Sequence, residues 1–377
     1  MSKNLIAYDK NLHIISAKKH VVCYLASWAV YRTDKGKHKI SNIKPKLCTH
    51  FIYSFTGLSY DGKIETLDPD YDVKAFKNFI TLREKNPCAK FLIAIGGWNQ
   101  GSAKFSYMSE TPERREIFVD SVMRFLIHYD FDGLDLDWEY PAQRGGINED
   151  KKNLNELLKL LKNKFASRKK ILTIAIPSST YSLKQGYDIE NMCKNVDFVS
   201  VMAYDMNVPN EASVHAPLKL EKNEKKRETI DDVIKFMIKE KCPANKIILG
   251  ITSVAKTFTL KKSNSNDIGA PITALGTPSN YLKAEGSLGF NEMCTKFEDD
   301  DGWTHKHMKN NAVKISYKDH FWAVYDDETT VEQRGQYVLD NKLAGLMFWS
   351  IDTDDFYPEC HKAKYPLLVA ANKVFKN

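Results

Sequence analysis

Residues 131–141 read Phe-Asp-Gly-Leu-Asp-Leu-Asp-Trp-Glu-Tyr-Pro, and four acidic residues fall within eight of these positions. From Leu134 onward, apolar and acidic side chains alternate strictly, and a period of two is typical of a β-strand. The carboxylates of Asp135, Asp137 and Glu139 therefore share one face, about 6–7 Å apart, because a strand rises ~3.3 Å per residue. Carboxylates at this spacing repel one another, so we expect at least one of them to hold or share a proton.

Such a row of acids can be the solvated face of an edge strand, a metal site or a catalytic site. The interleaved Leu134, Leu136 and Trp138 require a buried face, which argues against a plain surface strand. The pattern therefore favours a catalytic or metal-binding site over surface charge. Asp132 is an odd number of residues away from Asp135, so its side chain does not share the face of the other three acids. We expect it to have a structural role at the start of the strand.

The acidic strand is one of eight predicted strands that alternate with amphipathic helical patterns. This alternation predicts an α/β fold, a closed parallel (β/α)8 TIM barrel. An excess of about 70 residues between the seventh strand and the next helix is too long for a loop and predicts a small inserted α+β domain. We assign residues 1–20 to a leader, 21–377 to the barrel and 257–325 to the insertion. The other seven predicted strands are residues 21–26, 50–55, 91–95, 171–176, 197–204, 246–251 and 343–350.

Composition excludes several classes of protein. The 55 basic and 48 acidic residues are spread along the chain without a basic arm or nucleic-acid motif, so we expect no nucleic-acid partner. No apolar run approaches membrane-spanning length, and residues 1–20 show no clear secretory signal. The seven cysteines lack CxxC spacing, which argues against zinc, and their odd number leaves at least one unpaired within the chain.

The residues at the carboxyl ends of the predicted strands combine aromatic rings with acids. In a TIM barrel the chemistry lies at these ends. Core packing explains any single tryptophan there, but several beside acids favour a carbohydrate cleft: indole faces suit the apolar C–H faces of sugars, and acids can protonate a glycosidic oxygen. The residues predicted at this end are Trp28, Phe55, Trp98, Glu139, Tyr204, Asp205 and Trp349.

With these residues in place, the chain closely resembles the animal-type chitinases of glycoside hydrolase family 18, whose signature is DGxDxDWEYP. The resemblance runs from about Val21 to Leu368. Its further blocks, in the same order, are residues 23–24 and 31–32, 47–50, 94–99, 202–205, 269–271 and 349–356.

The resemblance implies that the enzyme hydrolyses β-1,4-linked N-acetylglucosamine with retention, by substrate-assisted catalysis through an oxazolinium ion. In this scheme Glu139 is the acid and later the base, Asp137 holds the substrate acetamide, Asp135 shares a proton with Asp137, and Tyr204 aims the acetamide oxygen. Strand parity agrees, because Asp137 shares a face with Glu139 and is badly placed for backside attack. No cofactor or metal is implied. The implied substrate-binding residues are Tyr24, Trp28, Phe55, Gly97, Trp98, Tyr140, Met202, Asp205, Lys256, Met347 and Trp349.

The resemblance also pairs Cys23 with Cys48 and Cys294 with Cys360, which implies an oxidising, extracellular route of secretion. The three cysteines without an assigned partner are expected to be buried thiols: Cys88, Cys193 and Cys242. The implied partner is chitin or a chitooligosaccharide, and we expect a monomer without a membrane association.

The sequence departs from the family pattern at three positions that the resemblance places along the cleft. Residues 252–260 read TSVAKTFTL where the family usually reads PTYGRSFTL, so Val254 and Lys256 replace Tyr and Arg. Lys256 keeps the charge but loses the planar fork of Arg. Asn210 aligns with a tryptophan that would stack on the leaving side. We therefore expect weaker binding of long substrates, with the chemistry intact.

Two other functions stay open from sequence alone. A chitinase-like lectin would bind chitooligosaccharides without cleaving them, but such proteins typically lose the acid at the position of Glu139. An endo-β-N-acetylglucosaminidase would act on glycoproteins. The Trp349 block and the inserted domain favour a chitinase over this second alternative.

Overall fold

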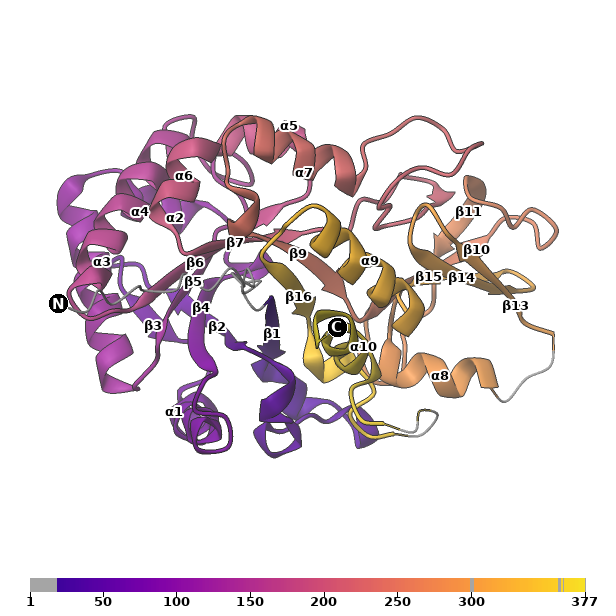
Figure 1. The fold of residues 1–377 in the computed structure, drawn as a ribbon, viewed down its shortest axis with the longest axis horizontal. Coiled ribbons are helices and arrows are strands. Elements are labelled where there is room, and N and C mark those ends of the chain that lie inside the picture. Colours follow the sequence, from indigo (N-terminus) through magenta and orange to yellow (C-terminus); the bar gives the residue numbers. More distant parts are fainter. Residues whose placement is uncertain (1–18, 299–301, 359–360, 362, 377) are drawn as a thin grey trace, which may run out of the picture.

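Eight parallel strands form a closed barrel in the computed structural model, which describes residues 19–298, 302–358, 361 and 363–376 (Figure 1). The barrel closes because β1 pairs in parallel with both β2 and β16. The short strand β3 (Ile64–Thr66) extends β2 as an antiparallel hairpin. The predicted (β/α)8 barrel is therefore confirmed. Its strands are β1 (His20–Ala26), β2 (His50–Leu58), β4 (Lys90–Gly96), β5 (Gly133–Asp137), β6 (Ile171–Pro177), β7 (Phe198–Met202), β9 (Ile247–Thr252) and β16 (Gly345–Trp349).

Helices lie outside the barrel strands (Figure 1). Several begin with side-chain caps: the Thr111 hydroxyl accepts from Arg114 N, and Thr229 and Asp232 form a reciprocal capping box. Within the described residues, every helix is too short or too polar to span a lipid bilayer. The helices around the barrel are α1 (Pro69–Ile80), α2 (Ala103–Ser109), α3 (Pro112–His128), α4 (Asp150–Ala166), α5 (Thr180–Gly186), α6 (Ile189–Asn195), α7 (Ile230–Lys239), α9 (Glu328–Asp340) and α10 (Pro366–Lys376).

Strand parity divides the apolar residues of the barrel into two clusters. One face of each strand packs against the helices in the larger cluster, which contains Leu134, Leu136 and Trp138. The other face points into the barrel, where a smaller cluster contains Tyr24, Leu92 and Met347. The acids of β5 therefore lie on the inner face, as the alternation predicted.

The excess residues after β9 form the predicted insertion domain, which lies to one side of the barrel (Figure 1). Its antiparallel sheet surrounds a core that includes Phe258 and Trp322. The sheet begins at Val254, and β8 (Glu211–Ala212), from the segment between β7 and α7, pairs with β11. The remaining elements are β10 (Val254–Leu260), β11 (Ala270–Leu275), β12 (Ser287–Gly289), α8 (Phe290–Glu298), β13 (Thr304–Met308), β14 (Val313–Lys318) and β15 (Phe321–Tyr325).

The cysteines agree only in part with the sequence expectation. Cys23 and Cys48 form the implied disulfide. The expectation of free thiols at Cys193 and Cys242 is wrong, because these residues form a second disulfide with their Cα atoms 5.5 Å apart. Cys193 lies on α6 and Cys242 follows α7, and the sequence gives no sign that these ends meet. Cys88 is a free thiol but is exposed, not buried, because it lies in the turn before β4. The implied Cys294–Cys360 pair lies outside the described residues.

Candidate active site

The end of β5 is held at the barrel mouth by close contact with β4. Gly96 pairs with Asp137, and a Cβ at Gly96 would lie 2.0 Å from the Asp137 carbonyl oxygen. The next residue, Gly97, has φ +81° and donates its backbone N–H to that same oxygen at 2.9 Å. Glycine is therefore required at position 96, because any side chain there would push the backbone of Asp137 out of place.

Trp138 anchors the acidic segment from the outer side. It is buried, stacks on Phe105 with ring centroids 5.3 Å apart, and donates from Nε1 to the Ser102 hydroxyl at 3.0 Å. Asp132, at the start of the strand, accepts from Phe91 N at 2.8 Å and from Arg83. These contacts fit the structural role expected for Asp132.

Asp135 lies deepest in the barrel and is fully buried. Its two carboxylate oxygens accept hydrogen bonds from the hydroxyls of Tyr24 (2.7 Å) and Thr173. Burial raises the pKa of Asp135 to about 6, and the two hydrogen bonds to the ionised form limit the rise. Tyr24 therefore supports Asp135 from within the barrel.

Asp137 lies between the other two acids and reaches the cleft. Burial, followed by the charges of Glu139 and Asp135, raises its pKa well above the usual range. Its Oδ1 atom is buried and has no hydrogen-bond partner within the described part of the chain. Asp137 can therefore hold a proton, and its Oδ1 atom is free to accept or donate a hydrogen bond at the base of the cleft.

Glu139 lies beyond the end of β5 at the cleft surface, with 7% of its area exposed. Burial raises its pKa, and the charge of Asp205 raises it further. A hydrogen bond with Tyr140 and the charge of Arg144 act in the opposite direction. The net rise favours a protonated carboxyl that faces the cleft, which is what a general acid requires.

Arg144, which sequence reasoning missed, fixes the surroundings of Glu139. Its guanidinium donates to the carbonyls of Glu139 and Trp98, both at 2.9 Å, and lies 3.5 Å from the centroid of the Trp98 ring. The exposed Trp98 ring is thereby held in place by a cation–π contact beside the acid.

Three aromatic rings form a continuous floor next to the acids. Phe55 stacks on Trp349 at 5.7 Å and on Trp28 at 6.1 Å between centroids. Trp28 is 44% exposed, so one end of this floor is open to solvent. An apolar aromatic surface of this kind suits the faces of sugar rings.

A cleft of about 1240 Å³ gathers most of the predicted residues. Tyr24 and Met347 are instead buried in the barrel interior. The predicted residues that line it are Trp28, Phe55, Gly97, Trp98, Asp137, Glu139, Tyr140, Met202, Tyr204, Asp205 and Trp349. Lining residues that sequence reasoning missed include Tyr31, Leu67, Tyr71, Asn99, Gln100, Ser178, Ser179, Ser182, Met206, Val208, Arg227 and Glu228.

The three departures from the family pattern have distinct surroundings. The Lys256 ammonium pairs with Asp205 at 2.7 Å, so the replacement of Arg by Lys keeps an ion pair at the cleft edge. Val254 begins β10 and pairs with Gly289. Asn210 is exposed, with φ +63°, and other residues of its loop line the cleft, among them Met206 and Val208.

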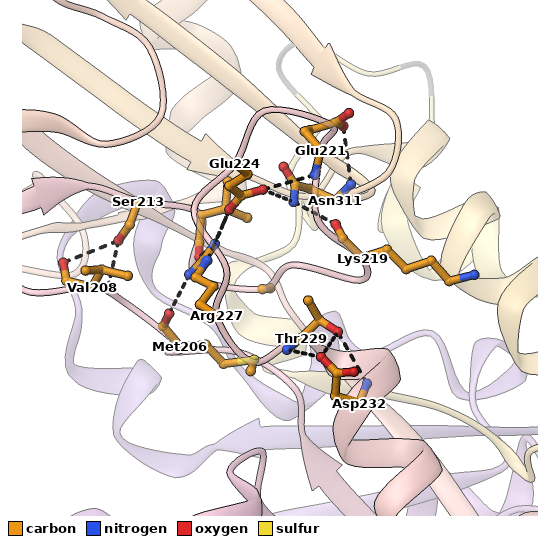
Figure 2. A network of polar contacts seen from close by, with 12 residues as sticks. Met206, Val208, Ser213, Lys219, Glu221, Glu224, Arg227, Thr229, Asp232 and Asn311 are labelled. Carbon is orange, nitrogen blue, oxygen red and sulfur yellow. Dashed lines mark hydrogen bonds and ion pairs between the residues drawn. The ribbon is translucent and has the colours of Figure 1, made fainter.

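Arg227 joins the two parts of this loop, which runs from β7 to α7 (Figure 2). It donates to the carbonyls of Met206 (3.0 Å) and Val214 (2.7 Å) and pairs with Glu224. No sequence motif marks Arg227, because its partners are mainly backbone carbonyls brought near by the loop itself.

The described residues contain no cluster of three or more His, Cys, Asp or Glu side chains suited to a metal ion. The acidic row itself presents two carboxyls to the cleft, Asp137 and Glu139, with Asp135 occupied by Tyr24 and Thr173. The geometry places two carboxyls with raised pKa values next to an aromatic floor at the mouth of the barrel.

Comparison with known proteins agrees with this geometry. The family model described as Glycosyl hydrolases family 18 matches residues 20–354. The endochitinase of Manduca sexta is 37% identical over 375 residues, which cover 95% of this chain and 67% of that protein. The crystal structure of a Group IV chitinase of Ostrinia furnacalis is similar, with a TM-score of 0.92 and 34% identity over 95% of this chain and 100% of that one, and the enzyme has also been solved with allosamidin.

Human YKL-39, described as a pseudo-chitinase that retains chitooligosaccharide binding, has the same fold, with a TM-score of 0.87 and 27% identity. It covers 95% of this chain and 100% of its own. The chain belongs to glycosyl hydrolase family 18. The predicted enzyme class, a glycoside hydrolase, is therefore confirmed.

Proposed function

We propose that this protein is a chitinase that hydrolyses β-1,4 linkages between N-acetylglucosamine units with retention of configuration, through an oxazolinium intermediate. The observation that carries the proposal is the row of Asp135, Asp137 and Glu139 on one strand face, with Glu139 nearest the aromatic floor, Asp137 at the base of the cleft and Asp135 buried beneath it. This arrangement provides one proton donor and places the other acids below it.

Glu139 acts first as the acid. Burial raises the pKa of its carboxyl, which favours the protonated form that delivers a proton to the bridging oxygen as the glycosidic bond breaks. The resulting carboxylate then takes a proton from water, which attacks the anomeric carbon and opens the oxazolinium ring. One residue thus acts as acid and base in turn.

The nucleophile is the carbonyl oxygen of the substrate's own acetamide. An enzyme nucleophile would have to lie about 5–5.5 Å from the acid, on the opposite side of the scissile bond. Asp137 comes from the same strand face as Glu139, and the carboxylate of Asp205 is paired with Lys256. Attack by the acetamide, with the electron pair of the broken bond passing to the leaving oxygen, needs neither.

Asp137 and Tyr204 orient the acetamide. The unpartnered Oδ1 of Asp137 is available to accept the acetamide N–H, and its negative charge would stabilise the positive ring that forms. Burial and the charge of Asp137 raise the pKa of Tyr204 well above the usual range, so its hydroxyl stays protonated and can donate to the acetamide oxygen. Asp135 accepts or returns the proton of Asp137 during the cycle.

The substrate class follows from the cleft and from the relatives. The floor of Trp28, Phe55 and Trp349 suits N-acetylglucosamine rings, and the Ostrinia chitinase binds allosamidin. The two disulfides support an extracellular site of action.

The proposal is tested with wild type and Glu139→Gln on chitin hexamer, with binding measured by calorimetry. We expect wild type to cleave the hexamer and Glu139→Gln to bind it while cleaving at least about a thousandfold more slowly, since general acid catalysis and its coupled steps are lost. Equal rates in the two proteins would refute the role of Glu139. Binding without cleavage by wild type would identify a lectin.

A further inference from the structure

One wall of the cleft is built by the segment that connects β7 to α7. Two separate parts of this segment line the cleft: Met206 to Val208 near its start, and Arg227 with Glu228 near its end. The sequence resemblance places the leaving-side sugars along this loop. The wall is formed by irregular backbone, so its shape depends on the contacts that hold it.

Arg227 ties the two parts of the wall together. Its Nη1 donates to the Met206 carbonyl and its Nη2 to the Val214 carbonyl, while Nε donates to Glu224 at 3.1 Å (Figure 2). Only the planar fork of an arginine can serve three acceptors in these directions. Arg227 is 15% exposed and Glu224 is 4% exposed, so the ion pair is largely shielded from solvent.

Glu224 uses both carboxylate oxygens. Oε1 accepts from Arg227, and Oε2 accepts from the Asn311 side chain at 2.9 Å. A carboxylate can accept on both sides, whereas an amide has one oxygen and one NH2 group and would have to give up one of these partners. A carboxylate is therefore needed at position 224 to keep the contacts with both Arg227 and Asn311.

Asn311 connects this series of hydrogen bonds to the insertion domain. It lies in the turn between β13 and β14, is fully buried, and donates also to the Lys219 carbonyl at 2.8 Å. In the same turn, the backbone N–H of Asn310 donates to Glu221 at 2.8 Å, and the Leu218 N–H donates to the Asn311 carbonyl. The cleft wall is thus connected through Glu224 to the antiparallel hairpin of β13 and β14.

We propose that the Asn311–Glu224–Arg227 relay makes the insertion domain a positioning device for the leaving-side wall of the cleft, with Glu224 and Arg227 as positioning residues that set the affinity for sugars beyond the scissile bond. This inference rests on the proposed function and adds a specificity determinant outside the acidic strand. The relay affects the affinity for long substrates and leaves the proton transfers at Glu139 unchanged.

The test compares two substrates in wild type, Glu224→Gln and Arg227→Lys. Chitin hexamer extends along the leaving-side wall, whereas the aryl group of 4-methylumbelliferyl chitobioside ends at the first leaving-side position. We expect each variant to raise KM for the hexamer about five- to tenfold, the effect of one or two lost hydrogen bonds, with kcat within about twofold. Both constants for the aryl glycoside should stay within about twofold of wild type.

The matched control is Glu240→Gln, an exposed glutamate at the end of α7 that should leave both substrates unaffected. Equal changes for the two substrates, or no change for the hexamer, would overturn the proposal. Arg227→Lys decides the question if Glu224→Gln does not fold. If wild type cleaves neither substrate, the proposed function fails, and calorimetric affinities for hexamer and dimer test the relay alone: a selective loss for the hexamer supports it, and equal affinities contradict it.

Discussion

The hydroxyl of Tyr24 on β1 donates a 2.7 Å hydrogen bond across the barrel interior to Asp135 on β5. Both residues are buried, and burial together with the charges of Asp135 and Asp137 raises the pKa of Tyr24 well above its usual range. Tyr24 therefore acts as a fixed donor that favours the ionised form of Asp135.

Replacing Tyr24 with Phe should weaken catalysis through Asp135. Loss of a donor to the carboxylate raises the pKa of Asp135 above about 6, so the acidic limb of the activity profile should move to higher pH. We expect kcat at neutral pH to fall about tenfold, the effect of one hydrogen bond to a charged group. The pH dependence of hexamer hydrolysis measures both effects.

Tyr53→Phe is the matched control, because Tyr53 donates an equivalent 2.7 Å bond to Asp72 on the helix-facing side of the barrel. It should reduce stability without moving the acidic limb. The same shift in both variants would contradict a specific role for Tyr24.

Replacing Asp135 with Asn should stabilise the fold at high pH while reducing activity. The pKa of Asp135 is raised from 3.8 to about 6, so folding favours the protonated form. Below pH 3.8 the carboxyl of Asp135 is protonated in both the folded and the unfolded protein and does not affect the free energy of unfolding. Between pH 3.8 and about 6 the carboxyl ionises in the unfolded chain but not in the folded one, so the free energy of unfolding falls as the pH rises. The penalty above pH 6 is up to about 3 kcal/mol, and Asn removes it.

Urea unfolding at pH 4 and pH 8 measures this difference. Asp135→Asn should be more stable than wild type at pH 8 and close to wild type at pH 4. A difference that does not change with pH would show that Asp135 does not carry the raised pKa.

The ion pair between Asp205 and Lys256 should influence the pKa of Glu139 without touching it. Asp205 raises the pKa of Glu139, and Lys256 partly neutralises it. The alkaline limb of kcat/KM should therefore move up in Lys256→Gln and down in Asp205→Asn. Because Asp205 is 56% exposed, salt screens its charge, so each shift should be small and should shrink further as the ionic strength rises. Shifts of the same sign in the two variants would refute this coupling.

The disulfide between Cys193 and Cys242 should stabilise the barrel without affecting catalysis. It joins residues 49 apart in sequence, and closing a loop of this length is worth about 4 kcal/mol in the chain-entropy account. The Cys193→Ala, Cys242→Ala double variant should lose that free energy of unfolding and keep wild-type kcat. Cys88→Ala, at an exposed free thiol, is the control. A loss below about 1 kcal/mol would show that the bridge contributes little.

The acidic strand was predictable because a strand has a strict period of two. Leu134, Leu136 and Trp138 had to face the helices, which left Asp135 and Asp137 inside the barrel. The aromatic floor was predictable for a similar reason, since Trp28 after β1, Phe55 in the last part of β2 and Trp349 at the end of β16 all lie at the carboxyl end of the barrel.

Residues that act through tertiary contacts were not predictable in this way. Arg144 and Arg227 lie in loops without periodic patterns and bind backbone carbonyls, which every residue carries. The Cys193–Cys242 bridge depends on the approach of two helix ends that no local pattern determines. Tyr24 was predicted to bind substrate, but its inward parity on β1 takes it to Asp135.

The most direct test of the mechanism is the configuration of the first product, followed by proton NMR during hydrolysis of chitin hexamer. Attack by the acetamide followed by water inverts the anomeric carbon twice, so the newly formed reducing end should appear first as the β-anomer and reach equilibrium later by mutarotation. Initial release of the α-anomer would mean a single inversion and would contradict the assignment of Glu139, Asp137 and the substrate acetamide.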